Sequence, residues 1–143
     1  MKRLIRCVSL LLVMSMLMTV PAFAAEAPKA SYYFGRLSTY LEKTSGTSFE
    51  VWFDVTATGT MEELGVSTIK VQRSSDRSSW TTVKTFSKAD YSQMTDDNTV
   101  SHADCVTYTG TAGYYYRAKV TFYAENNSGS SEYVMYTDTI SVP

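Results

Sequence analysis

Cysteine, histidine and proline are scarce in this chain, with two, one and three copies among 143 residues. Because Cys7 lies within the N-terminal residues 1–25 discussed below, Cys105 has no partner in the rest of the chain, and an intramolecular disulfide is excluded there. For that thiol, burial is favoured over an intermolecular crosslink, since free cysteine is among the most buried residue types. With His102 as the single histidine, a zinc site would lack the three or four ligands that it needs, and we expect no metal.

Long runs of residues with the same charge are also missing from the chain. Residues 1–25 hold three of the 13 basic residues and none of the 14 acidic ones, so residues 26–143 carry a formal charge of about −4, without blocks. This balance gives no electrostatic reason to expect nucleic acid or an anionic membrane as a partner. The roughly 118 residues that remain suffice for one core, and a single domain is expected.

The N-terminus differs in composition from everything that follows it. Three basic residues precede an almost purely apolar run from Val8 to Val20, and the segment PAFAA then combines a break with the small-x-small pattern that signal peptidase cleaves. As a helix the run would span about 20 Å, less than the ~30 Å hydrocarbon core of a bilayer. We therefore predict a cleaved signal peptide over residues 1–25 and a secreted domain over residues 26–143.

The predicted secreted part is rich in Thr, Ser, Tyr and Val, a composition typical of strands. Apolar residues alternate with polar ones at period two, which indicates strands with one face on a core. The clearest sets are Phe49, Val51, Phe53, Val55 and Ala57, then Ile69 and Val71, then Tyr116, Ala118, Val120 and Phe122. Further strands are expected at Trp80–Phe86 and Glu132–Val142, with weaker candidates at Tyr32–Leu41 and Ser101–Tyr108.

Turn-forming residues separate these segments. Ser74–Ser79 and Glu125–Ser130 predict turns between neighbouring strands, since Asn, Asp, Gly and Ser favour such bends. Thr60–Gly65 (TMEELG) predicts a single helical turn, and Ala89–Asn98 predicts an irregular loop with a short helix. About seven short strands in one small domain indicate an all-β, antiparallel β-sandwich.

Two segments carry a resemblance to known modules. TIKVQRSSDRSSWTTVKTF (68–86) and GTAGYYYRAKVTFYAENNSGSSEY (110–133) resemble the middle and late strands of fibronectin type III or immunoglobulin-like domains. In those modules a Gly-x-Tyr segment opens the penultimate strand near a tyrosine corner, and the resemblance gives that role to Tyr114 or Tyr116. Arg77 departs from the pattern, because glycine is expected after Asp76 in such a turn.

The whole chain also resembles a group of small uncharacterised secreted proteins of Gram-positive bacteria, a domain of unknown function. The matching pieces are VWFDVTATGTMEELG, QRSSDRSSWTTVKT and GTAGYYYRAKVTFYA. This resemblance implies an immunoglobulin-like fold and no activity, since fold does not imply function.

Catalytic patterns are weak throughout, and we expect no enzyme and no cofactor. His102 and Cys105 are three residues apart, which places them on opposite faces of a strand rather than together as a nucleophile and base. No G-x-S-x-G elbow is present. An acidic stretch formed by Asp90, Asp96, Asp97, Asn98 and Asp104 leaves calcium open, but a solvated loop is favoured, because the spacing matches no calcium loop.

Three aromatic residues are the candidate binding residues. Trp52, Tyr115 and Tyr123 fall out of phase with the core positions of their strands and are expected to face outward, without sharing one platform. Such outward rings commonly cover sheet edges or pack under loops, and that reading is favoured; where they are exposed, they stack on sugars or anchor protein partners. We therefore predict a secreted, non-catalytic binding or adhesion-type module for an unknown extracellular protein or glycan. A structural or self-assembling extracellular protein is the alternative, and the oligomeric state stays open.

Overall fold

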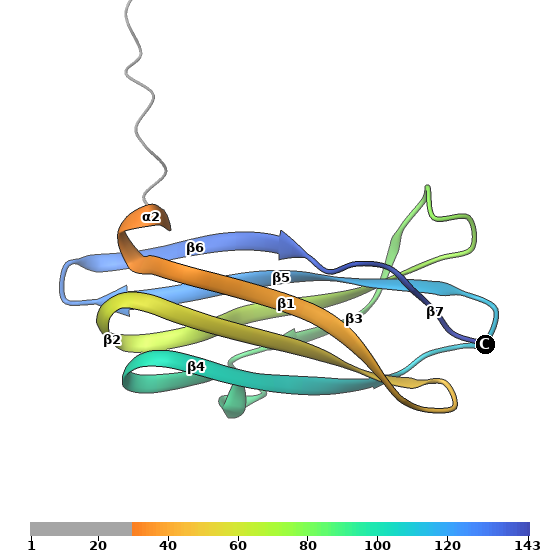
Figure 1. Cartoon of the computed structure of the whole chain (residues 1–143), viewed down its shortest axis with the longest axis horizontal. Helices are drawn as coiled ribbons and strands as arrows, with labels where there is room; N and C mark the ends of the chain where they lie inside the picture. The colour runs from red at the N-terminus through yellow and green to blue at the C-terminus, as the bar shows by residue number, and fades with distance from the viewer. Residues whose placement is uncertain (1–29) are drawn as a thin grey trace, which may run out of the picture.

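The computed structural model describes residues 30–143, so the predicted signal peptide over residues 1–25 lies outside the described residues. The described part is almost entirely strand (Figure 1). Its elements are a short helix α2 (Ala30–Tyr33), strands β1 (Phe34–Ser45), β2 (Ser48–Ser74) and β3 (Thr81–Ser87), a 3-10 turn η2 (Ser92–Met94), and strands β4 (Thr95–Thr109), β5 (Tyr115–Asn126), β6 (Gly129–Tyr136) and β7 (Ile140–Ser141). The predicted all-β class is confirmed.

The strands form one seven-stranded antiparallel sheet that curls on itself, with the long strand β2 at its centre. The first half of β2 pairs with β1 and β4, and its second half pairs with β3 and β5. Strands β6 and β7 then pair with β5. Figure 1 shows β2 and β4 turning together at one end of the molecule, so that the two halves of β2 run back along each other.

The curl brings the inner faces of both halves onto one core. The Phe49 ring, from the first half of β2, lies 5.2 Å from the Tyr116 ring of β5, centroid to centroid. Both side chains are fully buried. The period-two sets predicted from the sequence are all buried, namely Phe49, Val51, Phe53, Val55, Ala57, Ile69, Val71, Tyr116, Ala118, Val120 and Phe122. Burial of this apolar face stabilises the curl at about 25 cal/mol per Å².

The helical turn predicted over Thr60–Gly65 is wrong, because this segment continues β2 as a strand. Met61 and Leu64 are buried at a spacing that suggests a helix, but the spacing arises from irregular strand register. The register of β2 against β4 shifts between Thr56 and Met61, and such bulges bend a strand. Gly65, at φ 155°, allows the β4 backbone to pass close by: a Cβ atom there would lie 2.2 Å from the Met94 carbonyl oxygen.

The other predicted strands and helices differ from the observed ones mainly in where they begin and end. The predicted strand Glu132–Val142 is interrupted at Thr137, whose side-chain hydroxyl accepts a hydrogen bond from the Ala118 backbone N–H at 2.9 Å. The weaker strand candidates at Tyr32–Leu41 and Ser101–Tyr108 are present as the longer strands β1 and β4. The expected short helix in Ala89–Asn98 is the 3-10 turn η2.

Candidate functional site

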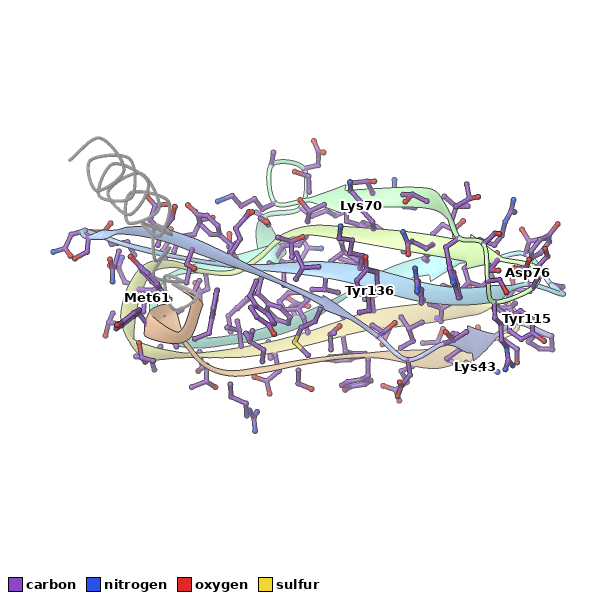
Figure 2. All side chains as sticks on the ribbon, turned by 90° about the horizontal axis from the view of Figure 1, so that it is seen from above. Lys43, Met61, Lys70, Asp76, Tyr115 and Tyr136 are labelled. Carbon is purple, nitrogen blue, oxygen red and sulfur yellow. The ribbon has the colours of Figure 1, made fainter. Side chains whose placement is uncertain are left out.

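Two outward faces of the curled sheet carry the aromatic and charged side chains. We call the first the platform face: it is the outer side of β1, the first half of β2 and β4, with Tyr40, Glu42, Glu50, Trp52 and Cys105. We call the second the cationic face: it is the outer side of the second half of β2, β5 and β6, with Lys70, Gln72, Arg117, Lys119 and Tyr136, bordered by Trp80. In Figure 2, Lys70 and Tyr136 are labelled midway along the molecule.

Tyr40 and Trp52 are the centre of the platform face. They lie directly opposite each other in β1 and β2, and adjacent strands place such side chains on the same face. The ring centroids are 6.2 Å apart and the ring planes differ by 7°, so the two rings are almost parallel. Trp52 is half-buried, while Tyr40 is 48% exposed. Together they present flat aromatic surface to solvent.

Carboxylates border this aromatic pair. Glu42 and Glu50 lie directly opposite each other in β1 and β2, two residues along from Tyr40 and Trp52. The Trp52 indole Nε1–H donates to the Glu50 carboxylate at 2.9 Å, which fixes the orientation of the indole. On the other side of Trp52, Cys105 is its direct partner in β4. Burial, followed by the charges of Glu50, Asp104 and Glu42, raises the pKa of the Cys105 thiol.

Two lysines and a tyrosine form a row across the cationic face. Lys70, Lys119 and Tyr136 lie directly opposite one another in β2, β5 and β6. Salt bridges within residues 30–143 join Arg36 to Asp54 and Lys88 to Glu63, and neither lysine of this row takes part in one. Like charges directly opposite in a sheet are destabilising, so this pair raises the free energy of the folded state.

Arg117 is held in a fixed position in the same face. Its guanidinium carbon lies 4.3 Å from the centroid of the Trp80 ring and 4.8 Å from that of the Tyr136 ring. Its Nε–H donates to the Gln72 side-chain oxygen at 2.8 Å. The two rings and the amide therefore hold the planar guanidinium in one orientation, since cation–π contacts add to the packing.

The three aromatic residues proposed from the sequence lie in different places. Trp52 is on the platform face, whereas Tyr115 and Tyr123 are on β5, in the other half of the sheet, and the structure does not bring the three together. The Arg77 guanidinium covers Tyr115 at 4.1 Å from the ring centroid. In Figure 2, Tyr115 lies near Asp76, which belongs to the Ser74–Ser79 turn. Each of the three is half-buried rather than freely exposed.

The ring and the hydroxyl of Tyr123 both contact charged side chains. The Lys88 ammonium lies 3.7 Å from the centroid of its ring, and its hydroxyl donates a hydrogen bond to the Glu125 carboxylate. That hydrogen bond, with burial and the charges of Glu125 and Glu63, raises the pKa of Tyr123 to about 12. Lys88 also pairs with Glu63 at 2.7 Å, so its charge is largely compensated. Tyr123 is therefore a less open binding residue than Trp52.

His102 and Cys105 lie on opposite faces of β4, as their spacing predicts. His102 pairs with Val55, and its ring lies 5.6 Å from that of the buried Phe53. Its Nε2 is 2.8 Å from the Gln93 carbonyl oxygen. Cys105 is half-buried on the outer face, so the expected burial of this thiol is wrong. The reason is that β4 is an edge strand there, so an outward side chain has a neighbouring strand on one side only.

The acidic stretch of the sequence does not converge on one point. Asp96 and Asp97 are exposed at the start of β4, while Asp104 lies eight residues further along the strand. Among residues 30–143, no group of three or more His, Cys, Asp or Glu side chains is placed to hold a metal ion. A shallow hollow near the β5–β6 turn is lined by Tyr32, Tyr33, Asn126, Ser128, Gly129 and Ser130, none of which is charged.

Sequence reasoning missed Tyr40, Trp80, Arg117 and Tyr136 as site residues. Tyr40 alternates with the half-buried Leu37, Thr39 and Leu41, which is the period-two signal of an outward position. That signal gives the face but not the partner, because the register that places Tyr40 opposite Trp52 depends on strand pairing. The sequence places Trp80 only at the start of an expected strand, whereas in the structure its ring packs on the Arg117 guanidinium.

Comparison with protein-family models and with curated proteins yields no match. Among solved structures there is a weak similarity to the sporulation control protein Spo0M from Bacillus subtilis, with 12% sequence identity and a TM-score of 0.40. The similarity covers 72% of this chain and 49% of that one, so this chain spans about half the length of Spo0M. In the part of the chain that the structure describes, no helix has the length and apolar character required to span a membrane.

Proposed function

We propose that this protein is a secreted, non-catalytic binding module that uses its platform face to bind an extracellular glycan. The observation that carries the proposal is the nearly parallel pair of Tyr40 and Trp52, held on an outward sheet face. Aromatic rings stack on the apolar faces of sugars, and aromatic side chains are also the usual anchors of interfaces. The predicted signal peptide over residues 1–25 supports the extracellular location.

The carboxylates beside the rings support a polar ligand of this kind. Glu42 and Glu50 supply hydrogen-bond acceptors next to the aromatic surface, and an ionised carboxylate accepts several hydrogen bonds from hydroxyl groups. Two adjacent negative charges disfavour a strongly anionic ligand on this face. A neutral or amino sugar chain therefore fits the platform face better than an acidic one.

The experiment is a glycan-binding screen of the protein beside three single substitutions, Trp52→Ala, Tyr40→Ala and Trp80→Ala. Trp52→Ala removes the centre of the platform face, and Trp80→Ala removes the chain's other tryptophan, which lies on the cationic face. We expect Trp52→Ala to abolish binding of a neutral glycan and Trp80→Ala to leave it unchanged. Binding that survives both Trp52→Ala and Tyr40→Ala would overturn the proposal.

Self-assembly is the alternative function, and one observation favours it. Cys105 is half-buried at an outer face, where a thiol of a second copy has access to it. Non-reducing gels and light scattering distinguish this function from the first. A disulfide-linked dimer that is lost in Cys105→Ser would support assembly, whereas a monomer at every concentration would exclude it.

We also propose that the curled sheet is an immunoglobulin-like or fibronectin type III-like sandwich. The shared core of the two halves of β2 supports this assignment. So does the buried Tyr116, whose hydroxyl accepts a hydrogen bond from a backbone N–H five residues upstream, as in a tyrosine corner. An experimental structure with one continuous, open sheet would contradict the sandwich assignment.

A further inference from the structure

We infer that the cationic face is a second binding site, distinct from the platform face, and that it binds a linear acidic polysaccharide through Lys70, Lys119 and Arg117. The carboxylate or phosphate groups of such a polymer would pair with these three cations. The inference does not depend on the glycan proposed for the platform face, because the two faces lie on different strand segments.

The distribution of charge along the fold is the first support. Seven of the nine basic residues in 30–143 lie on the second half of β2, on β3 and β5, or in the segments flanking β3: Lys70, Arg73, Arg77, Lys84, Lys88, Arg117 and Lys119. Eight of the 13 acidic residues in the same range lie on β1, β4 and β2 as far as Gly65. The chain is therefore negative overall but has a local excess of positive charge on one side of the molecule.

The second support is that the central pair of cations is uncompensated. Lys70 and Lys119 lie directly opposite each other, and neither forms a salt bridge within the described residues. Asp138, the nearest acidic residue along the chain from Tyr136, is exposed and forms no salt bridge there either. A repulsive pair of this kind lowers stability, and proteins commonly retain such a cost where function requires it.

Arg117 adds a preorganised anion donor next to the lysine pair. Its bond to Gln72 uses only the Nε–H, so the Nη–H groups remain for an incoming anion. Trp80 and Tyr136 hold the guanidinium plane, which reduces the entropy lost when a carboxylate or phosphate binds in a bidentate manner. A fixed arginine beside two lysines is suited to a polymer that presents several anionic groups.

The spacing of the three cations suits successive charges of one chain. Neighbouring strands are about 4.8 Å apart, which separates Lys70 from Lys119, and residues two apart in a strand are about 7 Å apart, which separates Arg117 from Lys119. A flexible polymer with a charge on every repeat can therefore contact all three cations at once on this open face.

Other occupants fit less well. A nucleic acid gains much of its affinity on such sheets from bases stacked on free aromatic rings, but both rings here already contact Arg117. A second copy of this chain would offer the carboxylates of Glu42 and Glu50 to the lysines. Glu50 already accepts the Trp52 indole N–H, so within the described residues only one of those carboxylates is free of a side-chain partner.

The experiment compares Lys70→Gln/Lys119→Gln with the control Lys43→Gln, which removes an exposed lysine on β1, outside the cationic face. Polygalacturonate probes carboxylate recognition, and inorganic polyphosphate probes phosphate recognition. At low salt we expect the double variant to bind the matching polymer about tenfold more weakly than wild type. The slope of log K against log salt concentration should be shallower for the double variant than for wild type, by about one to two. We expect Lys43→Gln to match wild type.

Folding is checked independently of binding, because removing the Lys70–Lys119 repulsion should leave the Tm of the double variant unchanged or higher. An equal loss of binding in Lys43→Gln, or no binding of wild type to either polymer, would overturn the inference. So would tighter binding of a single-stranded oligonucleotide, or self-association that the double variant abolishes. Trp52→Ala should leave polymer binding unchanged, so the failure of this site and the failure of the platform face give different results.

Discussion

The Tyr116 hydroxyl accepts a hydrogen bond from the Thr111 backbone N–H at 2.7 Å, which ties the start of β5 to the loop before it. Tyr116 is fully buried, and its ring contacts those of Phe49 and Tyr108. Thr111 lies between β4 and β5, so its N–H has no partner in a strand ladder. The side chain therefore replaces a backbone partner at the point where the chain crosses from one half of the sheet to the other.

Tyr116→Phe should lower the free energy of unfolding by about 1–2 kcal/mol, because the Thr111 N–H loses its partner while the ring packing is kept. Tyr108→Phe is the matched control, since Tyr108 contacts the same ring cluster and is only half-buried. Urea unfolding followed by circular dichroism measures both variants. Equal midpoints for the two variants would show that the hydrogen bond contributes little to stability.

Gly65→Ala should destabilise the protein by at least about 3 kcal/mol or prevent folding, because the added Cβ would lie 2.2 Å from a backbone oxygen of Met94. Gly59→Ala is the control in the same bend of β2, since a Cβ at that position has no atom within 4 Å. Urea unfolding measures stability where the variant folds, and the yield of folded protein measures it where it does not. A Gly65→Ala protein as stable as Gly59→Ala would contradict the close approach of β4.

The strand content could be predicted because it rests on local alternation. Every second residue from Phe49 to Ala57 is apolar, and the pleat alone then places those residues on one face. The sequence also marks the turn at Arg77 as unusual, because glycine is expected there, and the Arg77 φ is +63°, in the region that favours glycine. Asp76 makes this turn possible, since its carboxylate accepts hydrogen bonds from the backbone N–H groups of Ser78 and Ser79.

The bend of β2 and the composition of the two faces could not be predicted from local pattern. The bend depends on Met94 and Thr95 passing Gly65, a contact between segments about 30 residues apart that no short window contains. The pairing of Tyr40 with Trp52, and of Lys70 with Lys119, is set by strand register. Register is fixed by the global arrangement of strands, and a shift of one residue would move each side chain to the other face.

The carboxylate of Asp76 predicts a pH dependence of stability. Hydrogen bonds from the backbone of Ser79 and Ser78, and from the Ser74 hydroxyl, hold the pKa of Asp76 below its ordinary value of 3.8. Because the folded pKa is lower than the unfolded one, this contribution to stability is present above about pH 4 and is lost as pH falls through the folded pKa. Asp76→Asn should therefore be less stable than wild type at pH 6, with a difference that shrinks toward pH 2. Urea titrations at several pH values measure this, and a difference that stays constant with pH would contradict the assignment.

The thiol of Cys105 offers a direct test of the electrostatics of the platform face. Burial and the negative charges of Glu50, Asp104 and Glu42 raise the pKa of Cys105, so less of it is thiolate at pH 8 than in an exposed cysteine. Its reaction with a disulfide reagent should be slow at pH 8 and should accelerate only above the ordinary thiol pKa. Glu42→Gln/Glu50→Gln should shift the rate profile to lower pH, because two of the three charges are removed.

Glu62→Gln is the control for the Cys105 experiment, since that carboxylate lies on β2 beyond the platform face and is not among the charges that act on the thiol. The part of the reaction with the disulfide reagent that is lost in Cys105→Ser is assigned to this thiol. Because Cys105 is the direct strand partner of Trp52, a glycan bound on the platform face should slow the reaction further. A profile that is the same in Glu42→Gln/Glu50→Gln and wild type would mean that the two carboxylates are screened by solvent, and that the platform face carries less negative potential than its sequence implies.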